Sequence, residues 1–571
     1  MKKSIITLIF LGISSLLEAQ YSDIRIPEAL YGTTFDLDIH ESLKQIKSGT
    51  QTITGSINNE TFWGPTLFIN KGDNVSFNVT NNLNESTTVH WHGMHLPAVM
   101  DGGPHQIIPV GTLWHPYWKM TNDAGTYWYH PHLHETTEAQ ITKGVGGLII
   151  VKDAVESALP LPRNYGVDDI PIIMTSRNFD ASNQFSVGRA YGDNMLTNGT
   201  LNGQITLPKQ VVRLRILNAE IERGYNLGIV NSTGTPVDRI FYVIANDGGL
   251  LNAPVAVTRL PVHVGERYEI LVDLSGETLG SSLDIKAFNS GQSNSFPGGE
   301  PGQTGQFGST LNNKTFNVLH INIGAATSTP ITTIPTTLAT NTYLTHADAT
   351  VYRTVSITGG QNGGAVPFTF DGILFNINTI NKTLTVDKTE EWTIANTPNA
   401  IFGHSFHIHD VQFKIVSRST GSVGAYESGW KDTFFISKGE SVSFVCRFKD
   451  YADATHPFMY HCHFSQHEDD GMMGQFVVTG TPLGNTNYTP STKFKLYPNP
   501  VDTKLFINLE DPLADIYYIT ITTLEGRVAM MLPQPQWQNG IDVSNLSSGV
   551  YILKMMDKAT KSITSKKFIK K

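Results

Sequence analysis

The segment formed by residues 459–473 constrains this chain more than any other, because it carries metal-binding side chains on both sides of one extended stretch. It reads Met-Tyr-His-Cys-His-Phe-Ser-Gln-His-Glu-Asp-Asp-Gly-Met-Met. Side chains alternate across a β-strand, so Cys462 should face one way and its two neighbouring histidines the other. Cys462, His467, Met472 and one further histidine would form the ligand set of a blue-copper electron-transfer site. A short covalent path would then join metals on the two faces.

Three more pairs of histidines, each with one residue between them, precede this segment. Alternate residues of a strand face the same side, so both imidazoles of a pair can bind metal together. The pairs are His90 with His92, His130 with His132, and His407 with His409. His404 lies just before the third pair and is expected to supply the second imidazole beside Cys462. With His461 and His463, the pairs provide eight imidazoles, which is enough for three coppers bridged by oxygen.

Several other histidines lack a partner at metal-binding spacing. A lone histidine is more often a core or surface residue than a ligand, and we expect that of these. His134 extends the alternation of the second pair but is not expected to bind metal. The others are His95, His105, His115, His263 and His320.

The first 19 residues have the layout of a secretory signal peptide. Lys2 and Lys3 precede a mostly apolar run over residues 5–17, and the small residue Ala19 marks a cleavage site. The alternative reading is a membrane anchor, but the run is short for a membrane span. No later apolar run is long enough to cross a bilayer, and the net charge of -9 gives no indication of nucleic-acid binding. We therefore expect an exported protein that acquires its metal outside the cytoplasm.

The length of 571 residues, with 51 Gly and 28 Pro, predicts several turn-rich β-domains. The expected boundaries are 1–19 for the signal peptide, 20–155, 156–325 and 326–482 for three β-domains, and 494–571 for a small C-terminal module. The second domain has no histidine pair and is expected to be structural. Its Gly- and Ser-rich segment 289–313 is expected to be a mobile surface loop. Cys446 alternates with apolar residues on a strand, so we expect a buried thiol and no disulfide with Cys462.

Four motifs resemble, in order and spacing, the copper motifs of three-domain multicopper oxidases. They are His-Trp-His-Gly at 90–93, Trp-Tyr-His-Pro-His at 128–132, His-Ser-Phe-His-Ile-His at 404–409 and His-Cys-His-Phe-Ser-Gln-His-Glu-Asp-Asp-Gly-Met at 461–472. Further likeness lies at residues 100–104, 245–251, 265–269 and 429–433. The resemblance is closest to the bacterial branch that contains cuprous oxidases and laccases. It implies an all-β fold with three cupredoxin-like Greek-key β-sandwich domains.

The same resemblance implies four copper ions per chain. A blue, type 1 copper would use His404, Cys462, His467 and axial Met472, although Met473 is an alternative axial ligand. A mononuclear, type 2 copper would use His90 and His407. A coupled type 3 pair would use His92, His130 and His463 on one ion and His132, His409 and His461 on the other.

The C-terminal module resembles the sorting domain of the type IX secretion system. The likeness rests on Tyr-Pro-Asn-Pro at 497–500, Ser-Gly-Val-Tyr at 548–551 and the basic end at 566–571. It implies a small β-sandwich that engages secretion machinery, passage through the periplasm, and a secreted or cell-surface protein. The alternative is a β-sandwich used for adhesion.

The implied reaction couples one-electron oxidation of four substrate equivalents to the reduction of O₂ to water. Reduction of O₂ consumes protons, so carboxylates are expected near the cluster. The resemblance assigns this role to Asp101 and Glu468. As alternatives, Asp101 could be a turn carboxylate, and Glu468 could orient His467. Asp410 follows His409 where many relatives have Gly or an aliphatic residue, and its role is open.

Phenols or aromatic amines, as in laccases, are the favoured substrates. Cuprous oxidases carry a Met-rich insertion, whereas residues 359–367 contain no Met and none occurs between Met195 and Met459. Cuprous ion remains the alternative, since Met94 and Met100 are present. Other classes are a copper-binding electron carrier, a copper nitrite reductase and a copper sequestration protein. We expect a monomer, because one chain is long enough to hold all four coppers.

Overall fold

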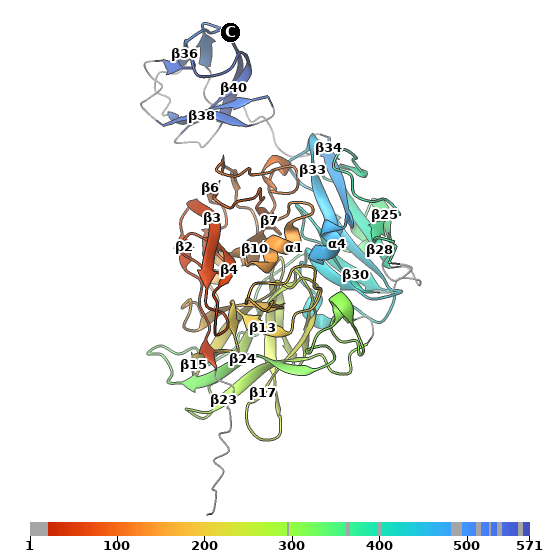
Figure 1. The fold of residues 1–571 in the computed structure, drawn as a ribbon. Helices are drawn as coiled ribbons and strands as arrows, with labels where there is room; N and C mark the ends of the chain where they lie inside the picture. Colours follow the sequence, from red (N-terminus) through yellow and green to blue (C-terminus); the bar gives the residue numbers. More distant parts are fainter. Residues whose placement is uncertain are drawn as a thin grey trace, which may run out of the picture. The chain divides into compact units, whose positions relative to one another are not determined.

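The computed structural model describes residues 21–293, 296–360, 366–396, 402–480, 494–509, 516–524, 527–533, 540–557 and 563–571. The expected signal peptide lies outside the described residues. The chain divides into two compact units, Met1–Pro482 and Leu483–Lys571. Both units consist mainly of β-strands, which confirms the predicted all-β fold (Figure 1).

The first sandwich of the larger unit packs two sheets around one apolar core. One sheet has the order β2 (Ala29–Tyr31), β5 (Thr66–Asn70), β11 (Gly147–Lys152), β10 (Gly125–His130), β7 (His90–His92). The other has the order β4 (Thr52–Ile57), β3 (Thr34–Lys44), β6 (Asn74–Asn81), β8 (Leu113–Trp114), with β9 (Tyr117–Lys119) also paired to β6. Strand β6 buries every second residue, because only one face reaches the core. Strand β10 is buried throughout, because both of its faces are covered.

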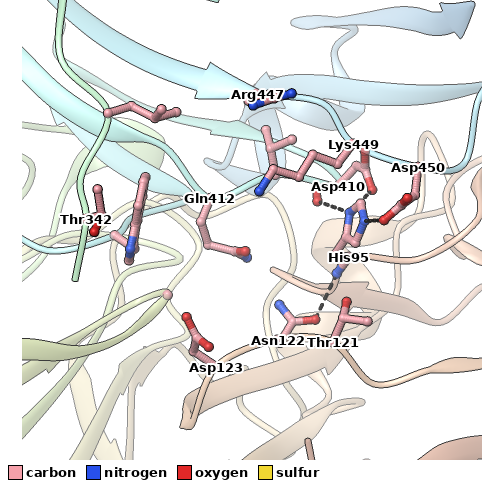
Figure 2. Close-up of a pocket in the computed structure, with 14 residues that line it drawn as sticks. His95, Thr121, Asn122, Asp123, Thr342, Asp410, Gln412, Arg447, Lys449 and Asp450 are labelled. Atoms are coloured by element: carbon pink, nitrogen blue, oxygen red, sulfur yellow. Dashed lines mark hydrogen bonds and ion pairs between the residues drawn. The ribbon is translucent and has the colours of Figure 1, made fainter. Parts of the chain in front are cut away.

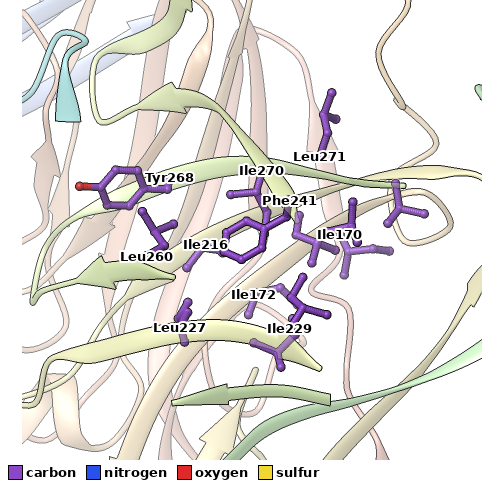
Figure 3. Packing of buried hydrophobic residues seen from close by; sticks show 14 of the residues in the cluster. Ile170, Ile172, Ile216, Leu227, Ile229, Phe241, Leu260, Tyr268, Ile270 and Leu271 are labelled. Carbon is purple, nitrogen blue, oxygen red and sulfur yellow. The ribbon is translucent and has the colours of Figure 1, made fainter. Parts of the chain in front are cut away.

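The second sandwich has the largest apolar core of the described chain, part of which is shown in Figure 3. One sheet has the order β1 (Ser22–Asp23), β15 (Gly203–Pro208), β24 (Thr315–Gly324), β23 (Ser282–Phe288), β17 (Tyr225–Asn231), β18 (Asp238–Arg239), with β21 (Leu260–Val262) on β17. The other has the order β14 (Thr200–Leu201), β13 (Asn194–Thr197), β12 (Asp169–Arg177), β16 (Val211–Asn218), β22 (Arg267–Asp273), β19 (Phe241–Asn246), β20 (Gly249–Val257).

The third sandwich carries the segment that ends at Met473. One sheet has the order β26 (Thr369–Phe370), β25 (Val351–Thr358), β28 (Thr389–Asn396), β32 (Ser441–Arg447), β30 (Lys414–Arg418). The other has the order β27 (Lys382–Thr385), β34 (Met473–Thr479), β33 (Asp453–Cys462), β29 (His404–Ile408), β31 (Thr433–Ile436). Cys446 lies on β32 and Cys462 ends β33. Both cysteines are buried and unpaired, as expected.

Short helices connect these strands. They are η1 (Ala98–Met100), α1 (Thr137–Thr142), α2 (Ala154–Ser157), η2 (Gly305–Phe307), η3 (His346–Asp348), η4 (Ala425–Glu427) and α4 (Ser465–Asp469). Helices α1 and α4 lie side by side, which joins the first sandwich to the third (Figure 1). No helix within the described ranges is long and apolar enough to span a membrane.

The C-terminal unit is a small β-module with its own apolar core. One sheet has the order β35 (Phe494–Tyr497), β36 (Lys504–Leu509), β39 (Ile541–Asp542). The other has the order β38 (Val528–Pro533), β37 (Ile516–Thr523), β40 (Gly549–Asp557), β41 (Ile563–Lys570). Of the residues that suggested a sorting module, Tyr497 ends β35, residues 549–551 begin β40 and residues 566–570 end β41.

Part of the segment 289–313 is buried, whereas residues 301–313 are exposed or half-buried, as expected for a surface loop. Phe296 and Glu300 are both buried. The carbonyl of Pro297 accepts a hydrogen bond from the backbone of Gly224 at 3.1 Å. The ring of Phe307 lies 5.1 Å from that of Phe402, two residues before His404. Phe296 therefore packs against His263 of the second sandwich, and Phe307 contacts the third.

Candidate metal centre

Strand pairing places the histidine pairs opposite one another. In the first sandwich, β7 and β10 run antiparallel, with His90 opposite His130. In the third, β29 and β33 run antiparallel, with His407 opposite His461 and Phe406 opposite Cys462. Because side chains alternate along each strand, the cysteine falls on the face away from the histidines. The local sequence pattern and the register of the sheet thus create two separate groups of ligands.

The cysteine group lies within the core of the third sandwich. Sγ of Cys462 is 3.6 Å from Nδ1 of His404 and 3.6 Å from Nδ1 of His467. Met472 is buried in the same apolar cluster, and its carbonyl accepts the Cys462 N–H at 3.1 Å. Phe368 covers the group, with its ring 4.6 and 4.5 Å from the two imidazoles. The arrangement is that of a compact, shielded site with two imidazoles and a thiol.

The eight remaining predicted histidines form one buried cluster between the first and third sandwiches, and each side chain is at most 1% exposed. Nδ1 of His92 lies 3.4 Å from Nε2 of His130 and 3.2 Å from Nε2 of His463. Nε2 of His132 lies 3.2 Å from Nε2 of both His409 and His461.

His90 and His407 complete the cluster. Their Nε2 atoms have no hydrogen-bond partner among the residues described. One nitrogen from each of them lies within 4.8 Å of a nitrogen of His409. The structure therefore brings together every histidine that the sequence pairs predicted. His134 is elsewhere, since its ring packs against that of Phe375.

Three acidic residues each hold two of these imidazoles. Asp101 accepts hydrogen bonds from Nδ1 of His409 at 2.7 Å, through Oδ2, and from Nδ1 of His90 at 2.9 Å, through its carbonyl. Such contacts fix the orientation of a ligand and leave the opposite ring nitrogen free for metal. Asp101 is therefore more than a turn carboxylate.

Glu468 holds two other imidazoles, those of His132 and His461, in the same way. Its Oε1 lies 3.0 Å from Nδ1 of His132, and its Oε2 lies 3.2 Å from Nδ1 of His461. Oε1 also accepts a hydrogen bond from Thr137 at 2.9 Å. Although buried, Glu468 has a pKa well below its usual value because His132 and His461 stabilise the carboxylate. These contacts are with the eight-histidine cluster and not with His467.

Asp432 is the third of these residues, and no pattern in the sequence predicted a role for it. Its Oδ1 accepts a hydrogen bond from Nε2 of His92 at 3.1 Å, and its carbonyl accepts one from Nδ1 of His407 at 2.8 Å. The sequence held one indication that Asp432 matters, because residues 429–433 take part in the resemblance to multicopper oxidases. Only the fold shows that the carboxylate reaches a histidine of the first sandwich.

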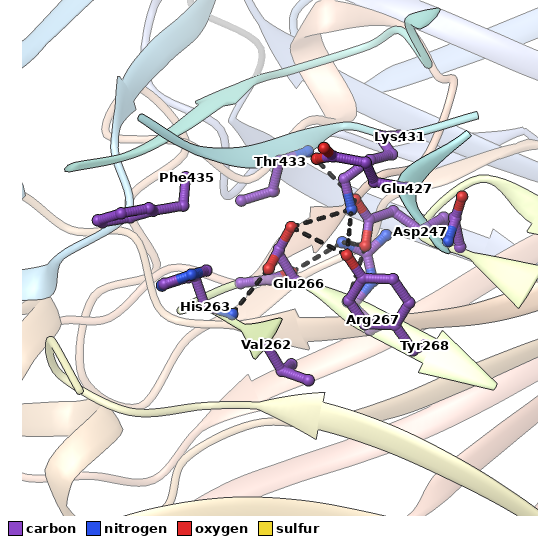
Figure 4. A network of polar contacts seen from close by, with 12 residues as sticks. Asp247, Val262, His263, Glu266, Arg267, Tyr268, Glu427, Lys431, Thr433 and Phe435 are labelled. Atoms are coloured by element: carbon purple, nitrogen blue, oxygen red, sulfur yellow. Dashed lines mark hydrogen bonds and ion pairs between the residues drawn. The ribbon is translucent and has the colours of Figure 1, made fainter. Parts of the chain in front are cut away.

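The second sandwich anchors Asp432. Arg267 donates two hydrogen bonds to its carboxylate, at 2.6 and 2.5 Å. Close by, Nζ of buried Lys431 lies 2.9 Å from Asp247 and 3.0 Å from Glu266 (Figure 4). The mutual attraction of such paired charges, together with their hydrogen bonds, offsets part of the cost of burying each of them. The second sandwich therefore contributes to the site through this network, although its sequence predicted only a structural domain.

The cysteine group has its own acidic neighbour. Oε1 of Glu222, from the second sandwich, lies 3.9 Å from Nε2 of His467. Glu222 is buried, and this oxygen has no hydrogen-bond partner within the described part of the chain. Burial raises the pKa of Glu222 to about 8, with a contribution from Glu138. No spacing rule in the sequence marked this residue.

The chemistry of the ligands fits a soft transition metal. Burial and the neighbouring imidazoles lower the pKa of most histidines in the cluster well below the usual value, as for His92, His407 and His409. Neutral imidazole is the form that binds metal. Burial raises the pKa of Cys462, so a bound cation would be needed to favour its thiolate. Thiolate, imidazole and thioether together suit copper.

The chain resembles known proteins over nearly all of its larger unit. Family models described as multicopper oxidase match residues 40–156 and 335–481. A multicopper oxidase mco from Staphylococcus haemolyticus is 30% identical over 424 residues, which is 73% of this chain and 82% of the relative. The chain belongs to the multicopper oxidase family, whose metal is copper.

The relatives differ in their names. A cell division protein FtsP from Escherichia coli is also 30% identical, over 441 residues, which is 76% of this chain and 87% of the relative. Among solved structures, the McoA multicopper oxidase from Aquifex aeolicus has a TM-score of 0.72 and 26% identity, covering 81% of this chain and 100% of that one. A laccase-like multicopper oxidase from Ochrobactrum sp., described as active towards lignin model compounds and lignosulfonate, has a TM-score of 0.69 and 28% identity, covering 80% and 100%.

The C-terminal unit also matches a known family. A model described as a secretion system C-terminal sorting domain covers residues 495–571. The fold of the larger unit is the cupredoxin fold of its structural neighbours, as the sequence predicted.

Proposed function

We propose that this protein is an oxidase that takes single electrons from a reducing substrate at the Cys462 group and delivers them to O₂ at the eight-histidine cluster, with water as product. One observation carries the proposal. Cys462 lies in the cysteine group, while the residues on either side of it, His461 and His463, belong to the cluster. A path of a few covalent bonds therefore joins the two groups.

We assign four coppers per chain to these groups. One is at His404, Cys462, His467 and Met472, and one is at His90 and His407. A coupled pair is assigned to His92, His130 and His463 and to His132, His409 and His461. Bound copper would supply reversible one-electron chemistry at the first site and the place of O₂ reduction at the cluster.

The protein's own residues hold the imidazoles and manage protons. Four electrons and four protons convert one O₂ to two waters. Asp101 and Glu468 touch four imidazoles of the cluster and are the carboxylates placed to pass protons toward it. Phe368 excludes water from the cysteine group.

Copper stoichiometry with oxygen uptake tests the proposal directly. We expect about four coppers per chain, a strong blue absorption, and oxygen uptake with a reducing substrate. A carrier would bind about one copper and a nitrite reductase about two. A role in cell division alone, as the name of the FtsP relatives would suggest, predicts no oxygen uptake.

Phenols or aromatic amines are the proposed substrates, with cuprous ion as the alternative. The Ochrobactrum relative acts on lignin-type compounds. The free Oε1 of Glu222 near His467 can accept a hydrogen bond from a phenol hydroxyl or an amine. A carboxyl oxygen is a poor ligand for cuprous ion, which prefers thioether.

Two donors compared side by side separate these substrates. We expect faster oxygen uptake with a methoxyphenol than with cuprous ion. Glu222→Gln should raise KM for the phenol about threefold or more, and leave KM for an inorganic donor without O–H or N–H groups unchanged. Equal changes for both donors would remove Glu222 from substrate recognition.

Export is proposed to use both ends of the chain. Residues 1–19 would direct passage into the periplasm, and the sorting module would direct passage across the outer membrane, with release or surface attachment. We also propose that the oxidase acts as a monomer. Mass spectrometry of secreted protein would show whether the signal peptide and the module are removed.

A further inference from the structure

Asp410 is a buried acidic residue that directly follows His409, a member of the eight-histidine cluster. Its φ of 74° is left-handed, a conformation that side chains other than those of Asn and Asp rarely adopt. Glycine would adopt this conformation without strain, so the turn itself does not require a carboxylate. Burying a carboxylate costs free energy unless a partner offsets that cost. The contacts of this side chain therefore indicate its role.

His95 is the partner of Asp410 (Figure 2). Its Nδ1 lies 2.7 Å from Oδ1 of Asp410 and 3.1 Å from the backbone carbonyl oxygen of the same residue. Because both of these neighbours are acceptors, Nδ1 is the ring nitrogen that carries a hydrogen. His95 belongs to the first sandwich and Asp410 to the third, so the contact crosses the boundary between these two sandwiches.

Charge strengthens this contact. Burial acts to lower the pKa of His95, but the carboxylate of Asp410 has the larger effect and raises that pKa to about 9. Burial also raises the pKa of Asp410, and His95 opposes this rise. The mutual attraction of the two side chains offsets part of the cost of burying them.

Both members of the pair are anchored beside ligands of the cluster. His95 lies three residues after one cluster histidine, and its backbone N–H donates a hydrogen bond to Oδ1 of Asn122 at 3.0 Å. On the other side, the backbone N–H of His409 donates a hydrogen bond to the carbonyl of Met459 at 3.0 Å. Only one peptide unit separates His409 from Asp410, so a displacement of Asp410 would also displace His409.

The ring of His409 is surrounded by residues of the first sandwich. Its Nε2 lies 3.2 Å from Nε2 of His132, and its Nδ1 lies 2.7 Å from Oδ2 of Asp101. The ring also stacks on that of His90, with 3.9 Å between centroids. Because His409 itself comes from the third sandwich, its place among these residues depends on how the two sandwiches are held together.

We propose that His95 and Asp410 form a latch that fixes His409 against the first sandwich and thereby maintains one ion site of the coupled pair. This site is the one assigned to His132, His409 and His461. The proposal rests on the proposed function, which assigns copper to the cluster. His95 and Asp410 are positioning residues, because each acts through His409.

Copper retention tests the latch, using copper-loaded full-length protein titrated with a chelator. Asp410→Gly removes the carboxylate and suits the left-handed backbone, and His95→Phe removes the donor and keeps a ring. Each change should lower the affinity for one ion of the coupled pair about tenfold, as is typical for residues behind metal ligands. Loss of that ion would leave its neighbour uncoupled, so a new electron paramagnetic resonance signal should appear while the blue absorption is unaltered.

Combining the two changes shows whether the residues act as a pair. If they do, the double variant should lose no more affinity than either single variant, because the contact is already absent in each. Two independent effects would instead multiply to about a hundredfold. If His95→Phe misfolds and loses its blue absorption, Asp410→Gly alone decides the test.

A matched histidine separates the latch from a general loss of contact between the sandwiches. His105 of the first sandwich also contacts the third, since its Nε2 lies 2.8 Å from Oε1 of Gln475. Neither of these two residues adjoins a cluster histidine in the chain. His105→Phe should therefore leave the copper affinity of the cluster at the wild-type value.

Metal-free protein provides a measurement that does not depend on copper. The backbone N–H of His409 is hydrogen-bonded to Met459, and loss of the latch should free it more often. In Asp410→Gly this amide should exchange its hydrogen about tenfold faster than in the wild type, the range expected for a lost bond to a charged group. Mass spectrometry of peptides that contain His409 would measure the exchange.

Three results would overturn the latch. They are unchanged copper affinity and amide exchange in Asp410→Gly, effects that multiply in the double variant, and an equal loss of copper in His105→Phe. A failure of the oxidase proposal is distinct, because wild-type protein would then bind fewer than about four coppers or take up no oxygen. The exchange of the His409 amide would still report on the latch in that case.

Discussion

The Cys462 group and the eight-histidine cluster differ in how much of the fold each requires. All four candidate ligands of the Cys462 group lie in the third sandwich, within residues 404–472. The cluster draws its histidines from the first and third sandwiches, and Arg267 of the second anchors Asp432. The first group can therefore be built by one sandwich, whereas the cluster exists only when three sandwiches pack together.

The electrostatic surroundings of the two groups differ as well. Burial alone lowers the pKa of His467 to about 3. At the cluster, burial also acts to lower the pKa of His132. The carboxylate of Glu468 has a larger, opposite effect, so the pKa of His132 is raised above its usual value. An apolar environment suits a site that only exchanges electrons, while a site that also consumes protons needs carboxylates at its ligands.

The largest difference between the two groups should appear when the thiol of Cys462 is removed. Cys462→Ser should abolish the blue absorption and lower oxygen uptake by about a thousandfold or more, because the path to the cluster begins at Sγ. The cluster should keep its copper, since none of its eight imidazoles is changed. Metal analysis and absorption spectra of the purified variant would check this. Loss of all copper would show that the two groups depend on each other.

Removing the carboxylate that we propose as a proton carrier, Glu468, should affect the cluster alone. Glu468→Gln is expected to lower turnover about a hundredfold, the range of general acid–base catalysis, and to keep the blue absorption. Steady-state oxygen uptake and absorption spectra are the measurements. Glu440→Gln changes a buried carboxylate that pairs with Arg418 instead, and should not reproduce the effect. Full activity in Glu468→Gln would exclude the residue from the proton path.

A smaller effect is expected from the second sandwich. Arg267→Lys keeps the charge but loses the paired hydrogen bonds to Asp432, so the orientation of His92 and His407 is weakened. Copper affinity of the cluster should fall about tenfold, as is typical for residues behind metal ligands. Titration with a copper chelator, with the blue absorption as an internal reference, would measure it. An equal loss at the Cys462 group would point to general unfolding.

The smallest expected effect is on the pH dependence of stability, and it comes from Glu300 in the segment 289–313. Burial raises the pKa of Glu300 to about 7, from 4.5 in an exposed chain. The folded protein thus holds this proton more tightly than the unfolded chain does. The free energy of unfolding therefore falls as pH rises from about 4.5 to about 7. Glu300→Gln should remove up to about 2 kcal/mol of this pH dependence. Thermal unfolding at pH 5 and pH 8 would show it, and an unchanged difference between the two pH values would contradict it.

Sequence patterns alone predicted much of this protein. Alternation along strands placed Cys462 opposite its neighbouring histidines, and the His-x-His pairs identified all eight members of the cluster. Both inferences succeed because side chains alternate along a strand with a period of two. The spacing of residues in the sequence therefore shows which side chains share a face. The same rule identified Cys446 as a buried thiol.

Contacts between sandwiches were decided only by the tertiary structure. Nothing in the sequence spacing reveals that Asp432 approaches His92, that Arg267 approaches Asp432, or that Glu222 approaches His467. In each case the partner lies more than 150 residues away. The segment 289–313 was predicted as a loop from its composition, and only packing shows that Phe296 is buried. Local periodicity specifies which way a side chain points, but which surface it meets depends on how the folded sandwiches pack against each other.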